Sequence, residues 1–483
     1  MANYRFLFPV ALIALSTALH APHFQKELMS IHVWRQTQTE STSVLFYEED
    51  FDLFNPRRND RGDGDGLFRM EFPLLQWLTA GLYKLFGRHL VLSRLFNFII
   101  GLFSVWGMYA LLRAVFHHDQ TAFAGAWAFN WSPSFFYYTI NPMPDNLALC
   151  FGLWGLYFFR RFYTSGGAMR MGAAGGLLAL SALCKLPFIL FFIVPLACFL
   201  SVVFRRRLFL TDGHAFIWML ICLSLPLGWY LSVVPHWHGN GIVQGMLNRQ
   251  TTWNVLLDYA QHNLFSTLPE LMLNYASVPF FIIGVVNALQ KKRRYSPQIW
   301  IWGAGLAAVA AYALFELNMI AKIHDYYLFP LYPYLFLVVA LGIHTAWHGR
   351  RPWLRTATLA LLLCMPLTAW LRMQSRWNPE KPGFNADLLR HQAALRNAVP
   401  KDALVVAGND LSHFIFLYYI DKKGWGFHAD QLDSAGLHER IRRGARYLYS
   451  DSREVERVAA PFLDTLVLQA GTVHVFRLNA PVR

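Results

Sequence analysis

The polar residues that could do chemistry are concentrated between His32 and Pro73, in a stretch that lies between two apolar segments. Only 15% of the residues in the chain are charged, and elsewhere most of them stand in short clusters. The stretch combines Arg35 and the neighbouring Gln36 with acidic and hydroxyl side chains. Because loops between rigid elements often carry functional residues, we expect this stretch to form the floor of an active site on a membrane surface. Arg35 and Gln36 are its candidate substrate-binding residues.

Three carboxylates are candidates for a general base that takes a proton from a hydroxyl acceptor. Asp145 follows two prolines where an apolar segment begins, Glu71 stands just before another such segment, and Glu40 falls in a predicted surface helix. Each has a simpler interpretation. Asp145 could cap its helix and complement the helix dipole, for about 0.3–1 kcal/mol. Glu71 could be a loop carboxylate exposed to water, and Glu40 an ordinary polar residue of its helix.

Basic and aromatic residues at two further positions favour an anionic ligand. Lys185 interrupts a continuous apolar run, where an ammonium group is costly and usually functional. Its alternative is to extend toward the membrane interface. Lys322, His324 and Tyr326 stand close together before a proline-containing apolar segment. A cation, an imidazole and a phenol suit a phosphate with an adjoining lipid chain, although tyrosines are also common at membrane interfaces for other reasons.

The composition indicates a polytopic α-helical membrane protein. Of the 483 residues 55% are hydrophobic, and the mean hydropathy is +0.29, which is too apolar for an ordinary soluble enzyme. The formal charge of +14 could suit a nucleic-acid partner, but Lys and Arg occur in clusters between apolar runs and therefore indicate membrane topology. We expect no nucleic acid to bind. The five cysteines lie in apolar runs without metal-ligand spacing, so we expect neither a disulfide nor a zinc site.

About eleven transmembrane helices are predicted from apolar runs of roughly 14 to 22 residues, against about 20 needed to cross a bilayer. With eleven spans the basic clusters all fall on one side, as the positive-inside rule requires. These clusters lie at positions 5, 113, 160, 205, 291 and 350. The candidate residues and the tail then share the opposite, external side.

The chain is expected to comprise a membrane domain at 1–371, with a polar first external loop at 21–88, and a small soluble external α/β domain at 372–483. In this tail the pattern predicts strands at 403–408, 446–449, 465–469 and 473–478 and helices at 414–420 and 454–462. The tail could be a packing or folding appendage or a cap that contacts substrate.

Several motifs resemble, in their order and common sidedness, those of the C-type glycosyltransferases, most closely the protein O-mannosyltransferase and lipid A aminoarabinose transferase branch. They cover roughly residues 1–345 and comprise the polar first loop, Glu71-Phe-Pro-Leu-Leu-Gln-Trp77, Pro142-Met-Pro-Asp-Asn146, Lys185 and His324-Asp-Tyr-Tyr-Leu-Phe-Pro330. The resemblance implies a polyprenyl-phosphate sugar donor that enters from the bilayer and an external acceptor that attacks the anomeric carbon.

The resemblance also implies roles for individual residues. Lys185 matches the lysine that contacts the donor phosphate, and Lys322, His324 and Tyr326 match the loop beside the lipid phosphate. Asp145 matches the acidic residue that opens the fourth span.

The sequence departs from the family pattern after its first span. Members usually carry an acidic residue there, whereas this chain has Trp34-Arg35-Gln36. Glu71 stands where the aminoarabinose transferases have a lysine. The expected base is therefore Glu71 or Asp145, with Glu40 as the third candidate.

The expected function is transfer of a sugar from a polyprenyl-phosphate donor to a lipid, glycan or protein acceptor, on the periplasmic face of the inner (plasma) membrane and among its lipids. Converging cations could stabilise the departing phosphate, so no metal or other cofactor is expected. The alternative is a lipid or solute transporter or flippase with an external cap domain, which would favour inverted repeats and charges near the middle of spans. A scaffold would explain the tail but not Lys185. The sugar and the acceptor stay open.

Overall fold

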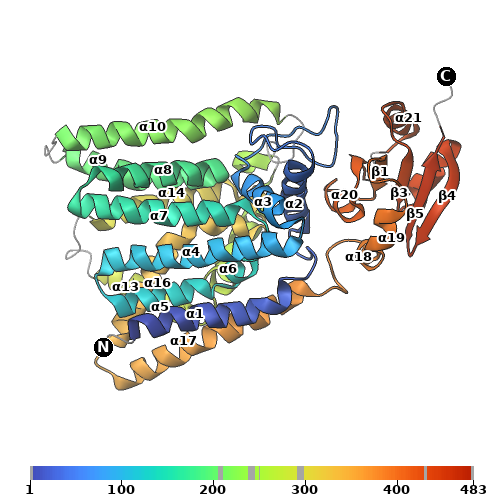
Figure 1. The fold of residues 1–483 in the computed structure, drawn as a ribbon. Coiled ribbons are helices and arrows are strands. Elements are labelled where there is room, and N and C mark those ends of the chain that lie inside the picture. Colours follow the sequence, from blue (N-terminus) through green and yellow to red (C-terminus); the bar gives the residue numbers. More distant parts are fainter. Residues whose placement is uncertain are drawn as a thin grey trace. The chain divides into compact units, whose positions relative to one another are not determined.

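The computed structural model describes residues 4–204, 210–237, 245–249, 251–290, 298–428 and 432–479. The predicted basic clusters at 205–207 and 291–294 lie outside the described residues. The chain divides into two compact units (Figure 1). The helical unit comprises residues 1–24, 70–72 and 94–374, and the mixed unit comprises residues 25–69, 73–93 and 375–483. The domain division at 371 stays a prediction.

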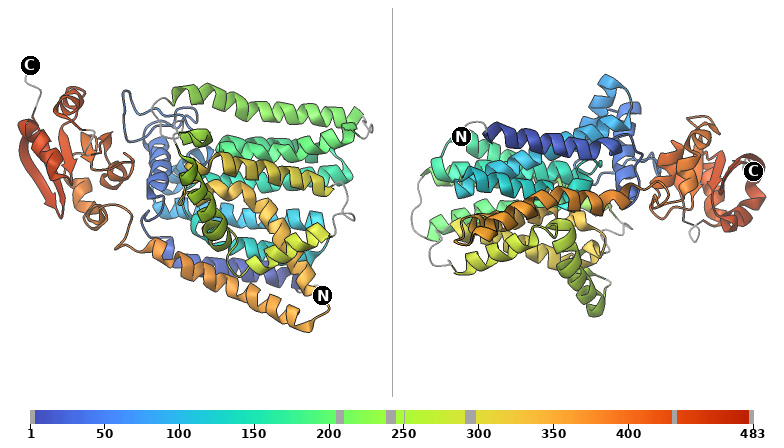
Figure 2. Two further views of the ribbon diagram at one scale, coloured as in Figure 1. Left: turned by 180° about the vertical axis from the view of Figure 1, so that it is seen from behind. Right: turned by 90° about the horizontal axis from the view of Figure 1, so that it is seen from below.

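The helical unit consists mainly of long apolar helices that run side by side (Figures 1 and 2). The longer helices are α1 (Tyr4–His20), α4 (Leu90–Phe116, which enters this unit at Arg94), α5 (Asp119–Asn130), α7 (Pro144–Ser165), α8 (Ala168–Cys184), α9 (Ile193–Phe204), α10 (Leu210–Val233), α12 (Trp253–His262), α13 (Val278–Gln290), α14 (Gln298–Phe315), α16 (Tyr332–Trp347) and α17 (Pro352–Met373). Short segments connect them: η1 (Ala21–His23), α6 (Pro133–Tyr138), η2 (Leu186–Phe192), η3 (Val234–His236), η4 (Met246–Asn248), η5 (Asn263–Met272), α15 (Leu317–Ile320) and η6 (Asp325–Leu331).

Four stretches of the described chain are long and apolar enough to cross a membrane. They are Leu90–Phe116, Gly213–His236, Asp325–Trp347 and Pro352–Trp377. Shorter apolar helices cover Ala168–Cys184, Leu186–Leu200, Val278–Gln290 and Ile301–Phe315. The mainly helical architecture with several apolar spans is confirmed, and the number of eleven spans stays a prediction.

Local sequence explains how the helices end and approach one another. The apolar segment from Thr121 to Ile140 contains two helices, α5 and α6, because Pro133 begins a new helix. Helices α13 and α16 pack closely at Gly342, where an added Cβ would overlap the Phe280 carbonyl oxygen. Small residues at a crossing allow such a close backbone approach, as is common between membrane helices.

The mixed unit joins the polar first loop to the tail. Its elements are α2 (Val33–Glu48), α3 (Leu74–Phe86), η7 (Gln374–Trp377, which leads into it), α18 (Ala386–Arg390), α19 (Gln392–Asn397), β1 (Leu404–Gly408), α20 (Ile415–Ile420), β2 (Lys423–Gly426), α21 (Ser434–Arg442), β3 (Tyr447–Ser450), α22 (Arg453–Ala459), η9 (Ala460–Phe462), β4 (Leu463–Ala470) and β5 (Val473–Leu478). The strand order is β2-β1-β3-β5-β4; β1 is parallel to β2 and β3, and the other pairs are antiparallel. The α/β character predicted for the tail is confirmed.

Backbone and side-chain contacts fasten the first loop to this sheet. Asp60 forms a parallel β-bridge with Gly424 of β2, and the Gly424 amide donates to the Asn59 carbonyl at 3.0 Å. Arg88 forms an ion pair with Asp421 at 2.8 Å. The loop therefore extends the edge of the sheet, which neither segment's pattern alone indicates.

Candidate active site

Lys185 and Asp145 form an ion pair within the helical unit, with 3.6 Å between Nζ and Oδ2. The Lys185 side chain is 12% exposed and that of Asp145 is 1% exposed. The ammonium also lies 5.5 Å from the ring centre of Tyr326 and 5.3 Å from that of Tyr327, within the range of cation–π attraction. The structure thus brings together Lys185, Asp145 and Tyr326, three of the residues predicted from the sequence.

Lys185 occupies this position because helix α8 stops immediately before it. The backbone at Lys185 is extended, with φ −157° and ψ 118°. Pro187 follows two residues later, and proline disfavours continued helix at the preceding residue. The apolar run therefore breaks into α8 and η2, and the break leaves the ammonium beside Asp145 and the tyrosines.

Asp145 lies in the first turn of helix α7, which begins at Pro144. The preceding loop is fixed from several directions. Arg94, which is fully buried, donates to the Asn141 side chain at 2.7 Å, and the Asn146 amide donates to the Tyr138 carbonyl at 2.7 Å. A carboxylate in the first turn also complements the helix dipole. The simpler capping interpretation thus remains compatible with the geometry, but Asp145 also holds Lys185.

Glu71 lies on a short segment attached to the end of α8. The Phe72 amide donates to the Leu183 carbonyl at 3.0 Å, and the Trp229 indole donates to the Met70 carbonyl at 3.0 Å. Glu71 is only 8% exposed, so it is not a loop carboxylate in bulk water. The bond from Phe72 to Leu183 and the ion pair of Asp145 with Lys185 place the two carboxylates near the same end of α8.

His324 borders the same group of residues. Its ring centre lies 5.8 Å from that of Tyr326 and 5.7 Å from that of Tyr327. Burial lowers the pKa of His324, and the positive charge of Lys185 lowers it further. The imidazole is therefore neutral at pH 7 and offers a hydrogen bond rather than a second positive charge.

Asp325, which the sequence analysis did not single out, anchors this loop. Its buried carboxylate accepts hydrogen bonds from the Tyr138 hydroxyl at 2.6 Å and from Ser134. These bonds join η6 to α6. Tyr326 and Tyr327, which face Lys185, belong to η6. A carboxylate within an aromatic and apolar run is the signal that could have identified it, because burial of such a group requires partners.

Asp325→Asn is expected to destabilise the protein by about 1.5–3 kcal/mol, the range for hydrogen bonds to charged groups. Asp258→Asn is the matched control, because Asp258 is 56% exposed and pairs with the surface residue Lys322, so its loss should cost no more than about 1 kcal/mol. Thermal unfolding of the detergent-purified variants measures the difference. Equal shifts for both variants would show that Asp325 does not anchor the loop.

Lys322 is 43% exposed and pairs with Asp258 of α12, with 2.6 Å between Nζ and Oδ2. Arg35, Gln36 and Glu40 belong to the mixed unit, on α2. Whether any of them contacts substrate stays a prediction.

Helix α2 is not the predicted surface helix. Glu40 is 2% exposed and accepts a hydrogen bond from the buried Tyr83 of α3. Arg35 donates to Gln38 one turn away, and the Gln36 amide donates to the Ile31 carbonyl at 3.1 Å. The surface interpretation is wrong because α3 and α20 pack against α2 and bury its polar side chains.

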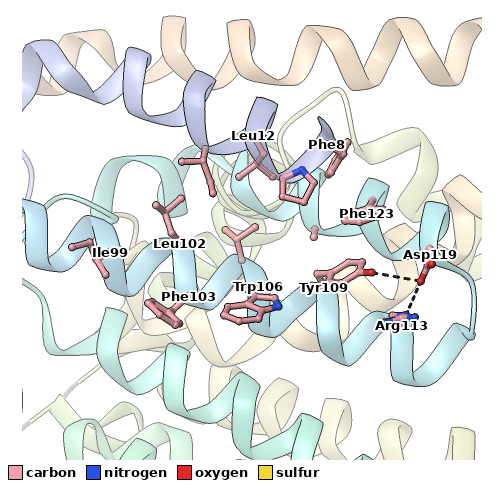
Figure 3. Close-up of a pocket in the computed structure, with 14 residues that line it drawn as sticks. Phe8, Leu12, Ile99, Leu102, Phe103, Trp106, Tyr109, Arg113, Asp119 and Phe123 are labelled. Carbon is pink, nitrogen blue, oxygen red and sulfur yellow. Dashed lines mark hydrogen bonds and ion pairs between the residues drawn. The ribbon is translucent and has the colours of Figure 1, made fainter. Parts of the chain in front are cut away.

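A separate cavity of about 540 Å³ lies between helices α1, α4 and α5 (Figure 3). Its walls are apolar, with Phe8, Leu12 and Trp106 among the described residues that line it, none of which is a predicted site residue. At one end Asp119 pairs with Arg113 at 2.6 Å. Apolar walls suit contact with lipid chains, so we do not assign this cavity to the reaction.

Comparisons with known proteins agree with this architecture. Residues 71–230, about a third of the chain, match the family of dolichyl-phosphate-mannose-protein mannosyltransferases, and this range contains Glu71, Asp145 and Lys185. No curated protein matches the chain in sequence. The structure of ArnT from Cupriavidus metallidurans in the apo state aligns over 99% of this chain and 98% of that one, with a TM-score of 0.69 and 12% identity. The chain has the fold of the C-type glycosyltransferases.

Two further structures share this fold. ArnT bound to undecaprenyl phosphate aligns with a TM-score of 0.68 and 12% identity over 99% of this chain and 98% of that one. The oligosaccharyltransferase of Archaeoglobus fulgidus aligns with a TM-score of 0.60 and 13% identity, over 92% of this chain and 69% of that one. The predicted resemblance to C-type glycosyltransferases is confirmed.

Proposed function

We propose that the protein is a membrane glycosyltransferase that transfers a sugar from a polyprenyl-phosphate donor to an acceptor on the external face of the membrane. The observation that carries the proposal is the half-buried Lys185 beside Asp145 and two tyrosines, at the break of an apolar helix to whose end the Glu71 segment is also attached. The solved structure of similar fold with bound undecaprenyl phosphate supports a lipid-phosphate donor.

Lys185 acts on the donor phosphate. When the anomeric carbon loses its bond to the phosphate oxygen, the phosphate takes the electron pair and gains negative charge. A cation in a water-poor site stabilises that charge strongly, because the local dielectric is low. Tyr326 and Tyr327 hold the ammonium and offer apolar surface to the first part of the lipid chain.

Asp145 and Glu71 act on the acceptor. The acceptor hydroxyl oxygen forms the new bond to the anomeric carbon, and its proton passes to a carboxylate. One carboxylate is the base, and the other orients the hydroxyl. The ion pair of Asp145 with Lys185 supports this assignment, because the proposed base then lies next to the cation proposed to bind the leaving group.

The transporter alternative is tested by one reconstitution. Protein in vesicles that contain an undecaprenyl-phosphate-linked sugar is expected to release undecaprenyl phosphate, measured by chromatography. Movement of the intact lipid-linked sugar between leaflets, without release of undecaprenyl phosphate, would instead support a flippase.

The proposed topology puts the tail and Asp145 on the same, external side of a bacterial inner membrane. The test fuses, after residue 483, a reporter enzyme that works only outside the cytoplasm. We expect this fusion to show reporter activity. A tail reporter that works only in the cytoplasm would contradict the eleven-span arrangement, because an odd number of spans separates the two termini.

A further inference from the structure

A cavity of about 520 Å³ lies within the mixed unit, at the carboxyl ends of its two central parallel strands. The loop that follows β1 contributes Asn409, Asp410 and Ser412, and the residue that follows β3 is Asp451. Strand β1 pairs with β2 on one side and with β3 on the other. The chain runs from β1 to β2 on one side and then crosses to β3 on the opposite side of β1, so the strand order reverses at β1. In α/β sheets such a switch point is the usual place for a ligand.

The walls of this cavity combine aromatic rings with amide and carboxylate groups. Trp34, Phe384 and Phe414 supply the rings. Of the described residues that line the cavity, none is Lys, Arg or His, whereas two are aspartates. A site of this charge disfavours ligands with phosphate or carboxylate groups, because protein sites for such anions use cationic donors.

The carboxylates are held in fixed orientations by the chain itself. Asp451 accepts a hydrogen bond from the Asn409 amide at 2.8 Å with one oxygen and from the Asn385 side chain at 2.7 Å with the other. Asp410 accepts from the amides of Ser412 at 2.9 Å and Phe416 at 3.0 Å. Asp410 also accepts from the Ser412 hydroxyl at 2.7 Å. An ionised carboxylate has about four acceptor positions, so Asp451 has more capacity than Asp410 to accept hydroxyl donors from a ligand.

We propose that this cavity binds a neutral saccharide. The C–H faces of a sugar ring pack on aromatic rings, and its hydroxyl groups donate to oriented carboxylate and amide oxygens. A volume of about 520 Å³ lies within the range of small-molecule sites. The cavity alone supports binding of the saccharide. We further infer that this saccharide is part of the acceptor, and that inference rests on the proposed function.

The test uses the purified full-length protein with three soluble probes: mannotriose and maltotriose, which are neutral, and sialyllactose, which is acidic. Saturation-transfer NMR measures binding. At least one neutral trisaccharide is expected to bind at millimolar concentration, and sialyllactose at least several-fold more weakly. Binding of neither neutral probe, or equal binding of all three, would overturn the proposal.

Two variants tie binding to this cavity. Asn409→Trp places a large ring at an exposed position of the lining while the backbone donor to Asp451 stays, and it is expected to weaken binding of the neutral trisaccharide at least tenfold. Leu466→Trp, at an exposed position of the edge strand β4, is the matched control and should leave binding unchanged. Asn409→Lys adds a cation and should shift the preference toward sialyllactose. Unchanged binding by both Asn409 variants would place the saccharide elsewhere.

Release of undecaprenyl phosphate from the lipid-linked donor with water as acceptor separates this proposal from the preceding one. The reaction does not require the cavity, so Asn409→Trp should retain it. If wild-type protein releases undecaprenyl phosphate but binds no neutral trisaccharide, only the saccharide site is refuted. If it binds the trisaccharide but releases none, only the transferase function is refuted.

Discussion

Asp145→Asn is expected to lower turnover by roughly 100- to 10,000-fold while the donor stays bound. Asparagine keeps the size and hydrogen-bonding shape of the side chain but cannot take a proton. Because Asp145 Oδ2 lies 3.6 Å from Lys185 Nζ, loss of the negative charge leaves the ammonium at least as attractive to a phosphate. Release of polyprenyl phosphate at saturating donor measures turnover, and a separate binding assay measures donor affinity.

Glu71→Gln removes the second carboxylate in the same conservative way, and it should also reduce turnover. Glu40→Gln is the control, because Glu40 is bound by Tyr83 within the mixed unit and should affect stability more than turnover. A residue that only caps a helix would lower stability by about 1 kcal/mol and leave turnover within a few-fold. Loss of turnover in Glu40→Gln alone, with both other variants active, would move the base to the first loop.

Lys185→Ala is expected to weaken donor binding by about 1.5–3 kcal/mol, the range for hydrogen bonds to charged groups, or roughly 10- to 150-fold in the dissociation constant. Removal of Lys185 also takes the ion-pair partner from the buried Asp145 carboxylate and should lower stability, so thermal unfolding of the variant is measured together with donor binding. Isothermal titration with undecaprenyl phosphate measures the loss.

Lys322→Ala is the comparison for Lys185→Ala. Lys322 is 43% exposed and already paired with Asp258, so its removal should change donor affinity much less. Unchanged affinity in folded Lys185→Ala would leave that lysine only the role of reaching toward the membrane interface. An equal loss in both variants would instead support the sequence-based expectation that both lysines contact the phosphate.

The sequence predicts the helices well where local signals decide the outcome. Long apolar runs flanked by basic residues correspond to α1, α4, α7 and α8, and the proline after Lys185 marks the break between α8 and η2. The proximity of Asp145 and Lys185 follows from the prediction that both lie on one side of the membrane. Their direct pairing required the structure, since nothing in either segment specifies its partner.

The sequence predicts less where contacts are distant. Helix α2 contains many Thr, Gln and Ser side chains and lacks an apolar face, which favours a surface helix, yet α3 and α20 cover it. Strand β2 was not predicted because Lys423-Gly-Trp-Gly426 lacks the alternation and β-branched residues of a typical strand. Its pairing with β1 and with the first loop decides its conformation.

The most direct test of the central claim is a structure of the protein with bound undecaprenyl phosphate. If Lys185 compensates the donor phosphate, its Nζ should lie at about 2.7–2.9 Å from a phosphate oxygen, the distance of a charge-assisted hydrogen bond. Asp145 should then lie on the side of the phosphate that faces the acceptor. A phosphate bound elsewhere, with Lys185 still paired only to Asp145, would contradict the account.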